Sequence, residues 1–248
     1  MIILKTQEEI KTIKEGGKIL ANVLKEIEKK VRPGITTLEL DRAAEALILS
    51  FGAKPAFRGY DGFPYSLCVS VNENIVHGLP SDYVLKDGDI IGLDLGVLYK
   101  GFNADMAITL PVGEISFEAK RLINVAKKSL RLAIKKAKIG NTTGDVGNTI
   151  QRFVEDQGFG VVRDLCGHGI GKNLHEDPKV PNFGRRATGE ELVVGMVIAI
   201  EPMVTMGDYN LRKSDDGYGY ATKDNSLTAH FEHTIAITKN GPYILTEL

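Results

Sequence analysis

A carboxylate at the centre of an apolar run is the feature that most constrains how this chain can fold. Residues 88–96 read Gly-Asp-Ile-Ile-Gly-Leu-Asp-Leu-Gly, typical of a buried β-strand that contains Asp94, and Asp105 follows on the next predicted strand. Burying a lone carboxylate is costly, so the group needs a cation or a proton. The pattern returns at residues 195–201, which end in Glu201. One such acid could be a paired core residue, but two copies, each followed by a second acid, predict a metal site.

The composition excludes several other classes of protein. The 248 residues suit one domain or two fused halves, and the formal net charge of −1 gives no sign of a nucleic-acid partner. No apolar run approaches the ~18 residues of a membrane span, and residues 1–5 do not read as a signal peptide. The two cysteines, Cys68 and Cys166, are too few for a disulfide framework. We therefore expect a cytoplasmic protein.

Hydrophobic periodicity and turn residues predict the elements of the first half. They are a helix at 7–30, a second helix from an N-cap at Thr37 to about Ser50, a loop outside the core at 55–65, strands within 66–77, and a hairpin of strands 90–98 and 102–110 whose three-residue bulged turn is 99–101.

The second half repeats this order. Helices are expected at about 116–138 and 143–157, and strands at about 159–166, 196–203 and 231–238. Gly34 and Gly52 recur 106 residues later as Gly140 and Gly158, and Asp94 recurs 107 residues later as Glu201. A chance match is the alternative, but a nearly fixed offset favours an internal repeat, about 7–112 and about 116–241. Two pseudo-equivalent αβ halves would then share one sheet and bring the repeated acids together.

The four acids are expected to meet on one face of that sheet. Asp94 and Asp105 lie symmetrically about their turn, which predicts that they face each other. Glu201 and Glu232 lie symmetrically about Asp216-Gly217, and Asp-Gly is a strong hairpin signal. Like charges at such distances repel unless something binds between them. Four carboxylates and one imidazole suit two divalent ions such as Mn, Fe, Co or Zn.

Five histidines are candidates for the remaining chemistry. His168 lies among glycines at the end of a predicted strand, and we favour it as the nitrogen ligand over a structural histidine. His175 and His77 would bind or protonate substrate, although each alone could equally be a surface residue. His233 follows Glu232 directly, so strand alternation turns it to the other face and a structural role is expected. We treat His230 as non-catalytic.

These residues carry a family resemblance that covers almost the whole chain. The sequence resembles the bacterial-type (type I) methionine aminopeptidases of the pita-bread metallopeptidase family. The shared motifs are His77-Gly78, Asp94-x-Gly96, Asp105, Gly167-His168-Gly169-Ile170-Gly171, His175-Glu176-x-Pro178, Glu201-Pro202 and Glu232-His233-Thr234. The resemblance implies an α+β pita-bread fold in one catalytic domain, 1–248, whose two pseudo-symmetric halves share a curved, mostly antiparallel sheet with helices on its outer face.

The resemblance also implies a metal centre. Asp94 would chelate one of two divalent ions (Co, Mn, Fe or Zn), Asp105 and Glu232 would bridge both, and His168 and Glu201 would complete the second. A bridging hydroxide would then attack the carbonyl of an N-terminal methionine when the second residue is small. The implied activity is removal of initiator methionine from nascent proteins.

Three side chains would support this reaction by the same resemblance. Glu201 would also shuttle the proton. His175 would hydrogen-bond the scissile carbonyl or its oxyanion, and His77 would contact the amide of the second residue.

The resemblance implies a pocket for the methionine side chain, but not every residue of this pocket matches the family. Cys68, Tyr60, Phe63 and Tyr218 match expected pocket positions, whereas Phe57 and Leu174 depart from an expected small thiol and an expected aromatic residue. Ordinary packing within the loop is the alternative for these residues. Asn72, Asn74 and Thr228 would form a monovalent cation site by similarity.

Other partners and rival functions follow from the rest of the chain. The Lys120–Lys138 segment is basic and contains no acid. A solvated helix face is the plainer interpretation, and a ribosome-docking surface is the sharper one. We expect a monomer. The rival functions are a proline-directed pita-bread aminopeptidase and a non-catalytic peptide-binding scaffold.

Overall fold

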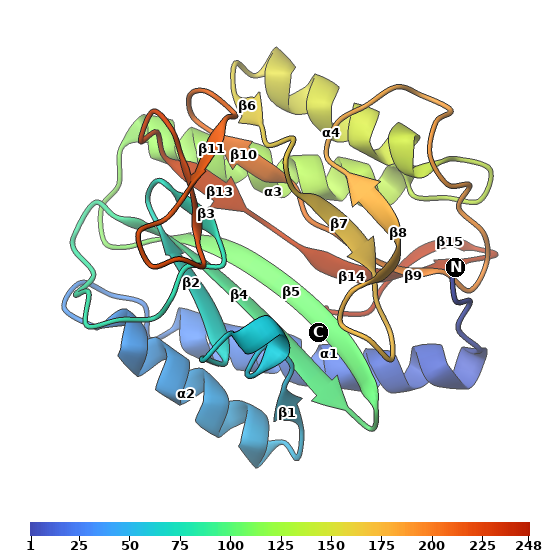
Figure 1. Ribbon diagram of the computed structural model, residues 1–248, viewed down its shortest axis with the longest axis horizontal. Coiled ribbons are helices and arrows are strands. Elements are labelled where there is room, and N and C mark those ends of the chain that lie inside the picture. The colour runs from blue at the N-terminus through green and yellow to red at the C-terminus, as the bar shows by residue number, and fades with distance from the viewer.

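A long antiparallel hairpin lies at the centre of the fold (Figure 1). The computed structural model describes residues 1–248, and the hairpin consists of β4 (Ile90–Tyr99) and β5 (Phe102–Pro111). Tyr99 pairs with Phe102, so the loop is only Lys100-Gly101, with φ values of 49° and 83°. The predicted three-residue bulged turn is therefore wrong. Two residues with positive φ form the tight turn that matches the natural twist of paired strands.

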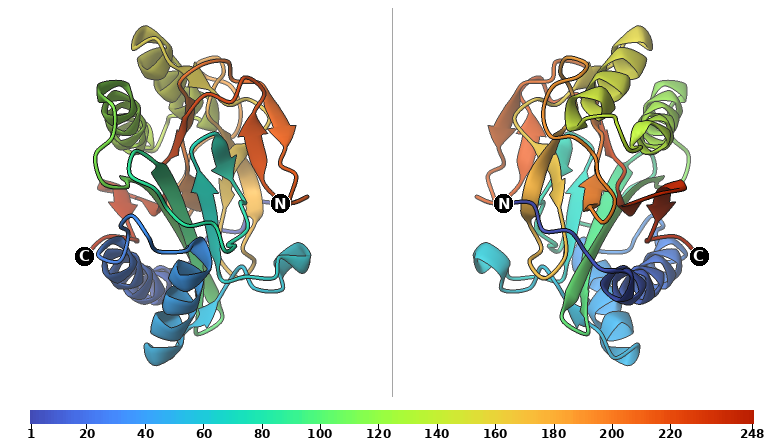
Figure 2. Two further views of the ribbon diagram at one scale, coloured as in Figure 1. Left: turned by 90° about the vertical axis from the view of Figure 1, so that its left-hand side faces the viewer. Right: turned by 90° about the vertical axis from the view of Figure 1, so that its right-hand side faces the viewer.

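Four helices cover the strands in two pairs, and both pairs lie outside them in Figures 1 and 2. The helices are α1 (Gln7–Glu28), α2 (Thr37–Ser50), α3 (Phe117–Lys136) and α4 (Thr143–Asp156). The four predicted helices are thus confirmed, with ends shifted by one or two residues.

The N-cap of α2 is Thr36 and not the predicted Thr37. The Thr36 hydroxyl accepts a hydrogen bond from the Glu39 N–H at 3.2 Å. The Glu39 carboxylate in turn accepts one from the Thr36 N–H, and the two bonds form a capping box. The Thr37 hydroxyl instead donates to Ser81 O. Thr142 caps α4 with a capping box of the same kind.

The remaining strands are short and form several small sheets beside the central hairpin. They are β1 (Lys54–Pro55), β2 (Leu67–Val71), β3 (Asn74–Val76), β6 (Gly160–Val161), β7 (Cys166–Gly169), β8 (Glu176–Pro181), β9 (Val197–Ile200), β10 (Met203–Thr205), β11 (Leu211–Lys213), β12 (Tyr220–Thr222), β13 (Thr228–His230), β14 (His233–Thr238) and β15 (Gly241–Ile244). The sheet orders are β1-β4-β2 with β5 on β4, β15-β14-β9-β7-β8, β13-β10-β6, and β11-β12-β3.

The region from β9 to β14 is one long interrupted hairpin. Ile200 pairs with His233 and Met203 with His230, and both pairs are symmetric about the Asp216–Gly217 bond. The pairing of β11 with β12 keeps the same symmetry, which confirms the predicted Asp-Gly tip. The predicted strand 196–203 divides at Glu201–Pro202 because proline has no N–H to donate to a ladder.

Two other expectations are corrected. The predicted strand 159–166 is reduced to β6, because the exposed polar residues 163–164 turn away from the sheet before β7 begins. The loop at 55–65 contains β1's Pro55 and a short 3₁₀ turn, η1 (Tyr60–Gly62), and buries Phe57 and Phe63. It therefore contributes to the core, contrary to expectation.

The interior contains two principal apolar clusters, one in each half. The first joins α1 and α2 to β2 and β4, and the second joins α3 and α4 to β9 and β14. No helix is both long enough and apolar enough to span a membrane.

Candidate active site

The four predicted acids meet where the two halves of the chain are joined. The Glu232 N–H donates to Ala107 O at 2.9 Å. The Asp105 N–H donates to the Thr234 hydroxyl at 2.9 Å, which in turn donates to Asp105 O at 2.8 Å. Strand β5 of the first half is thereby fastened along the β13–β14 line of the second half. This seam brings acids that are 127 residues apart in the chain, Asp105 and Glu232, into one group.

Asp94 and Asp105 do not pair directly. Asp105 is opposite Gly96 and Asp94 is opposite Ala107, so the two acids are diagonal neighbours. The expected register was wrong by two residues because the hairpin is centred between Lys100 and Gly101 and not between Tyr99 and Lys100. A shift of two keeps both side chains on the same face of the sheet, so they remain within reach of each other.

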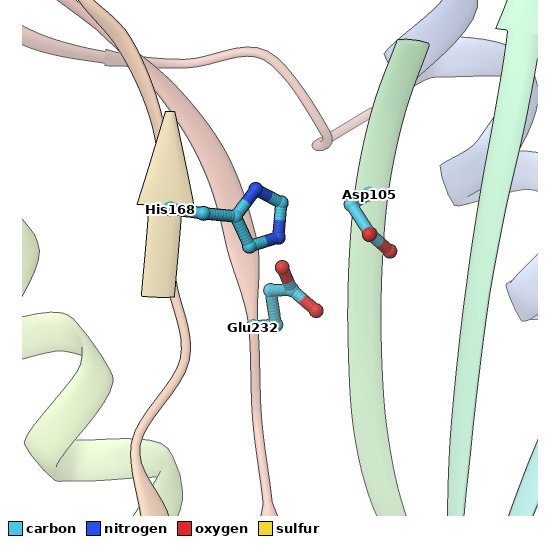
Figure 3. A group of neighbouring side chains, drawn as sticks. All are labelled: Asp105, His168 and Glu232. Atoms are coloured by element: carbon cyan, nitrogen blue, oxygen red, sulfur yellow. The ribbon is translucent and has the colours of Figure 1, made fainter. Parts of the chain in front are cut away.

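Three potential ligand groups converge in Figure 3. One ligand atom from each of Asp105, His168 and Glu232 lies within 4.8 Å of the others, and all three residues are buried. Glu201 Oε1 lies 3.7 Å from His168 Nε2, which places the fourth acid beside the triad. The side chains come from β5, β7 and the short segment between β13 and β14.

The carboxylates lack the partners that buried acids normally have. Asp94 Oδ1, Asp105 Oδ1 and Glu232 Oε1 are buried without a hydrogen bond. Desolvation raises the pKa of Asp94 to about 7. Desolvation and the neighbouring carboxylates raise the pKa of both Asp105 and Glu232 well above the usual range. Such groups are stable as anions only beside a cation, so the donor set fits divalent metal binding.

His168 is prepared to act as a neutral ligand. Its Nδ1 lies 2.8 Å from Gly169 O, which places the ring proton on Nδ1 and leaves Nε2 free to face the acids. Burial, the largest effect, lowers the pKa of His168 to about 3, so the ring is uncharged at neutral pH. Carboxylate oxygens with one imidazole nitrogen form a set that suits first-row divalent ions.

Two further histidines flank the acids. His175 Nδ1 lies 2.8 Å from the Tyr60 hydroxyl, and its ring centre is 4.3 Å from that of His168. His77 has a positive φ of 59°, and burial lowers its pKa to about 4. A Cβ at Gly78 would lie 2.2 Å from Val69 O, so only glycine allows the chain to carry His77 this close to β2.

One cavity of about 220 Å³ contains every predicted site residue. Beside the acids and histidines, its lining includes all the predicted pocket residues: Phe57, Tyr60, Phe63, Cys68, Leu174 and Tyr218. Phe57 packs directly on β4, since a Cβ at Gly96 would lie 2.7 Å from Phe57 Cε1. An open groove of about 540 Å³ shares His77, His168, His175 and Glu201 with this cavity and would provide an exit for a longer chain.

The sequence-based interpretation missed three residues of the cavity lining. Asp61, Lys213 and Tyr220 also line the cavity. Lys213 and Tyr220 are paired on β11 and β12 near the tip of the interrupted hairpin, and their residue types gave no signal.

His230 lies beside the acids rather than away from them. Its Nε2 is buried without a hydrogen bond, 3.7 Å from Glu201 Oε2 and 4.0 Å from Glu232 Oε2. A position two residues before Glu232 on an extended chain was the available signal. His233 does face away, with Nδ1 2.9 Å from the Thr246 hydroxyl.

Comparison with known proteins agrees with this arrangement. The model of metallopeptidase family M24 matches residues 11–239. The chain belongs to this family. Within the M24 family, it is 53% identical to the methionine aminopeptidase of Clostridium perfringens over 246 residues, which cover 99% of both chains. It is 47% identical to methionine aminopeptidase 1 of Bacillus subtilis over the full length of both. The resemblance inferred from the sequence is confirmed.

Solved structures of M24 relatives show the same fold. The crystal structure of the methionine aminopeptidase from Thermotoga maritima superposes with a TM-score of 0.98, at 46% identity, with 100% of both chains covered. The prolidase from Pyrococcus horikoshii superposes with a TM-score of 0.82 at 27% identity, and this chain covers 64% of it. The predicted α+β pita-bread architecture is therefore confirmed.

Proposed function

We propose that this chain is a dimetal aminopeptidase that removes the initiator methionine from nascent proteins when the second residue is small. The observation that carries the proposal is the buried group of Asp105, His168 and Glu232 at the wall of the 220 Å³ cavity. The methionine aminopeptidases to which the chain is similar support the substrate. The whole of 1–248 would act as one catalytic domain, in the cytoplasm, as a monomer.

Asp94, Asp105, His168, Glu201 and Glu232 would hold two divalent ions. When bound, these ions would supply Lewis acidity and would make water easier to ionise at neutral pH. The free α-amine of a peptide would bind at this metal centre. An internal peptide bond has no such amine, so only the first residue would be removed.

Side chains around this group would handle the protons. Glu201, itself one of the proposed metal ligands, would also accept the proton of the attacking water and return it to the departing amine. His175 Nδ1 lies 2.8 Å from the Tyr60 hydroxyl. With the hydroxyl as donor, the ring proton would be on Nε2 and would form a hydrogen bond to the scissile carbonyl oxygen. His77, which also lines the cavity, would contact the amide of the second residue.

The apolar part of the cavity would hold the methionine side chain. Phe57, Phe63, Cys68 and Leu174 are all buried there, and an unbranched thioether suits a narrow slot of this kind. A branched side chain of the same length would collide with the walls. Discrimination by such fit amounts to about 1–3 kcal/mol per methylene.

The decisive experiment measures hydrolysis of a peptide panel after metal removal. Stripped protein is reloaded separately with Mn, Co, Fe or Zn, and Met-Ala-Ser, Met-Leu-Ser, Leu-Ala-Ser and Gly-Pro-Ala are compared. We expect release of methionine from Met-Ala-Ser alone, and only with a divalent ion. Preferred cleavage of Gly-Pro-Ala would support the proline-directed rival. Peptide binding without cleavage under any metal would support the non-catalytic scaffold.

A monovalent cation is also proposed near β13. The Thr228 hydroxyl lies 3.0 Å from Asn72 O and 2.7 Å from Asn74 O, so three oxygens converge there. The amide side chains of Asn72 and Asn74 are already engaged with Asp89 and Ser214, which leaves the main-chain oxygens as the ligands. Thermal stability should rise with K⁺ or Na⁺ in the parent and lose this dependence in Thr228→Val. An equal response in both would contradict the site.

The basic side of α3 is proposed to dock on the ribosome, where nascent chains emerge. Its basic side chains between Lys120 and Lys138 are exposed, except for the half-buried Lys136. Charge reversal of Lys120, Lys127 and Lys135 should weaken cosedimentation with ribosomes and leave tripeptide hydrolysis unchanged. Reversal of the exposed α1 residues Lys11, Lys18 and Lys25 is the matched control. Equal cosedimentation of both triple variants would favour the solvated-face interpretation.

A further inference from the structure

A buried ion pair connects the N-terminal segment to the loop that carries His175. In Figure 1 the chain passes from the N-terminus beside β8 and β9 down to α1. Within this passage, the Lys5 N–H donates to Gly195 O at 2.7 Å. Lys5 Nζ lies 2.5 Å from Glu176 Oε2, and the side chains are only 3% and 4% exposed. Glu176 directly follows His175.

Stability alone does not account well for this pair. Removing two charges from water costs about as much as their attraction returns, and apolar replacements are often neutral or better. The pair must therefore be satisfied by additional hydrogen bonds, and it is. Lys5 Nζ donates to Ile3 O at 2.8 Å, and Glu176 Oε1 accepts the Asn173 N–H at 3.0 Å. A satisfied buried pair fixes one conformation of the segments that it joins.

The loop between β7 and β8 has no room to move around the pair. A Cβ at Gly171 would lie 2.5 Å from Lys5 Cε and 3.0 Å from Glu176 Oε1. From β5, Asn103 Nδ2 donates to Gly171 O at 3.0 Å and to Lys172 O at 3.1 Å. The loop is thus held on one side by Lys5 and on the other by the strand that carries Asp105.

We propose that Lys5 and Glu176 are positioning residues, which hold His175 at the working distance from the metal-binding acids. The inference rests on the proposed peptidase function and extends it to a segment outside the cavity. Lys5 sets the place of Glu176, and Glu176 closes the 173–176 turn so that His175 faces His168 and Tyr60. Without the pair, the His175 imidazole would occupy more than one position. A displacement of about 1 Å in a catalytic group can lower the rate by about 100-fold.

The test combines Lys5→Met and Glu176→Gln with His175→Ala. In the parent background, each of the first two should lower kcat for Met-Ala-Ser by about 10- to 100-fold and leave KM within about twofold. In the His175→Ala background, the same changes should have no further effect, because the residue they position is already gone. The proposal would be overturned if Lys5→Met or Glu176→Gln lowered kcat by the same factor in the His175→Ala background as in the parent. It would also be overturned if neither change altered kcat in the parent.

A second readout does not depend on activity. In protein labelled at histidine nitrogen, Lys5→Met and Glu176→Gln should shift or broaden the His175 ring signals and leave those of His233 in place. The control is Lys100→Met, which breaks an exposed pair with Glu15 (3.0 Å; 60% and 43% exposed) and should change neither readout.

The two proposals fail in different ways. A parent protein that hydrolyses no Met-Ala-Ser contradicts the function, whereas unmoved His175 signals in the variants contradict the positioning role. Should Lys5→Met not fold, Glu176→Gln decides alone, because its amide oxygen can still accept the Asn173 N–H while the charge is lost.

Discussion

Asp105 is the residue on which the proposed metal chemistry most depends. It is grouped with His168 and Glu232, and its Oδ1 is buried without a hydrogen bond, so its negative charge needs a cation. Asp105→Asn keeps the shape and removes the charge. We expect divalent-ion affinity and tripeptide hydrolysis to fall by more than about 100-fold, since removing even outer partners of a metal costs about 10- to 100-fold. Calorimetric titration with Mn²⁺ measures the first effect.

Asp156→Asn is the matched control for this substitution, because Asp156 is an exposed acid at the end of α4. Unchanged metal affinity in Asp105→Asn would remove this carboxylate from the ligand set.

Single residues were predictable where their chemistry conflicts with their surroundings. An acid inside an apolar run, such as Asp94, needs an explanation that an exposed acid does not, and the structure places it on the cavity wall. Lys213 and Tyr220 have no such conflict in the sequence, because only the folded hairpin brings them to the cavity. His230 was missed although its spacing from Glu232 was visible, because a histidine in an apolar strand is most often structural.

At the scale of elements, the β4–β5 hairpin sets the placement of two predicted ligands. Gly101 has a φ of 83°, and a Cβ there would meet nothing within 4 Å, so only backbone conformation opposes a larger residue. Gly101→Val should lower the free energy of unfolding by about 1–3 kcal/mol, because a branched residue is strained at positive φ. Urea titration at fixed metal concentration measures the loss.

Lys100→Asn is the companion variant, since asparagine is favoured at the first position of this turn. It should change the free energy of unfolding by less than about 1 kcal/mol, because the interactions lost are an exposed ion pair and an exposed contact of the ammonium with the Tyr99 ring. A larger loss in Lys100→Asn than in Gly101→Val would contradict the turn assignment.

Element types were easier to predict than element ends. Long amphipathic periods defined all four helices, whereas two adjacent threonines, Thr36 and Thr37, could each have capped α2. Only a tertiary contact decides between them, because the Thr37 hydroxyl donates its hydrogen bond to Ser81 O. The symmetry of Glu201 and Glu232 about Asp216-Gly217 was visible in the sequence, but the interruptions between β9 and β14 depend on how the segments pack.

At the scale of the whole molecule, the two halves are joined where the buried carboxylates gather. The free energy of unfolding should therefore depend both on pH and on whether a divalent ion is bound. Burial raises the pKa of Asp94 to about 7, and burial also lowers the pKa of His77 and of His233 to about 4. The histidines are therefore largely neutral in both folded and unfolded chains only above about pH 7.5, one unit above the ordinary histidine pKa of about 6.5. Above that pH only the acids still distinguish the two states.

The sign of the effect follows from which state binds more protons. The folded, metal-free chain holds protons on its buried acids that the unfolded chain has already released, so stability falls as pH rises through about 7. The slope is at most about 1.4 kcal/mol per pH unit for each proton. Stripped protein should therefore unfold at lower urea at pH 8.5 than at pH 7.5, where the histidines no longer contribute. Saturating Mn²⁺ should remove this difference, because bound carboxylates are ionised at both pH values. Stripped protein that is as stable at pH 8.5 as at pH 7.5 would show that the buried acids do not hold extra protons in the folded state. Glu232→Gln, with one buried acid fewer, should show a shallower slope than the parent.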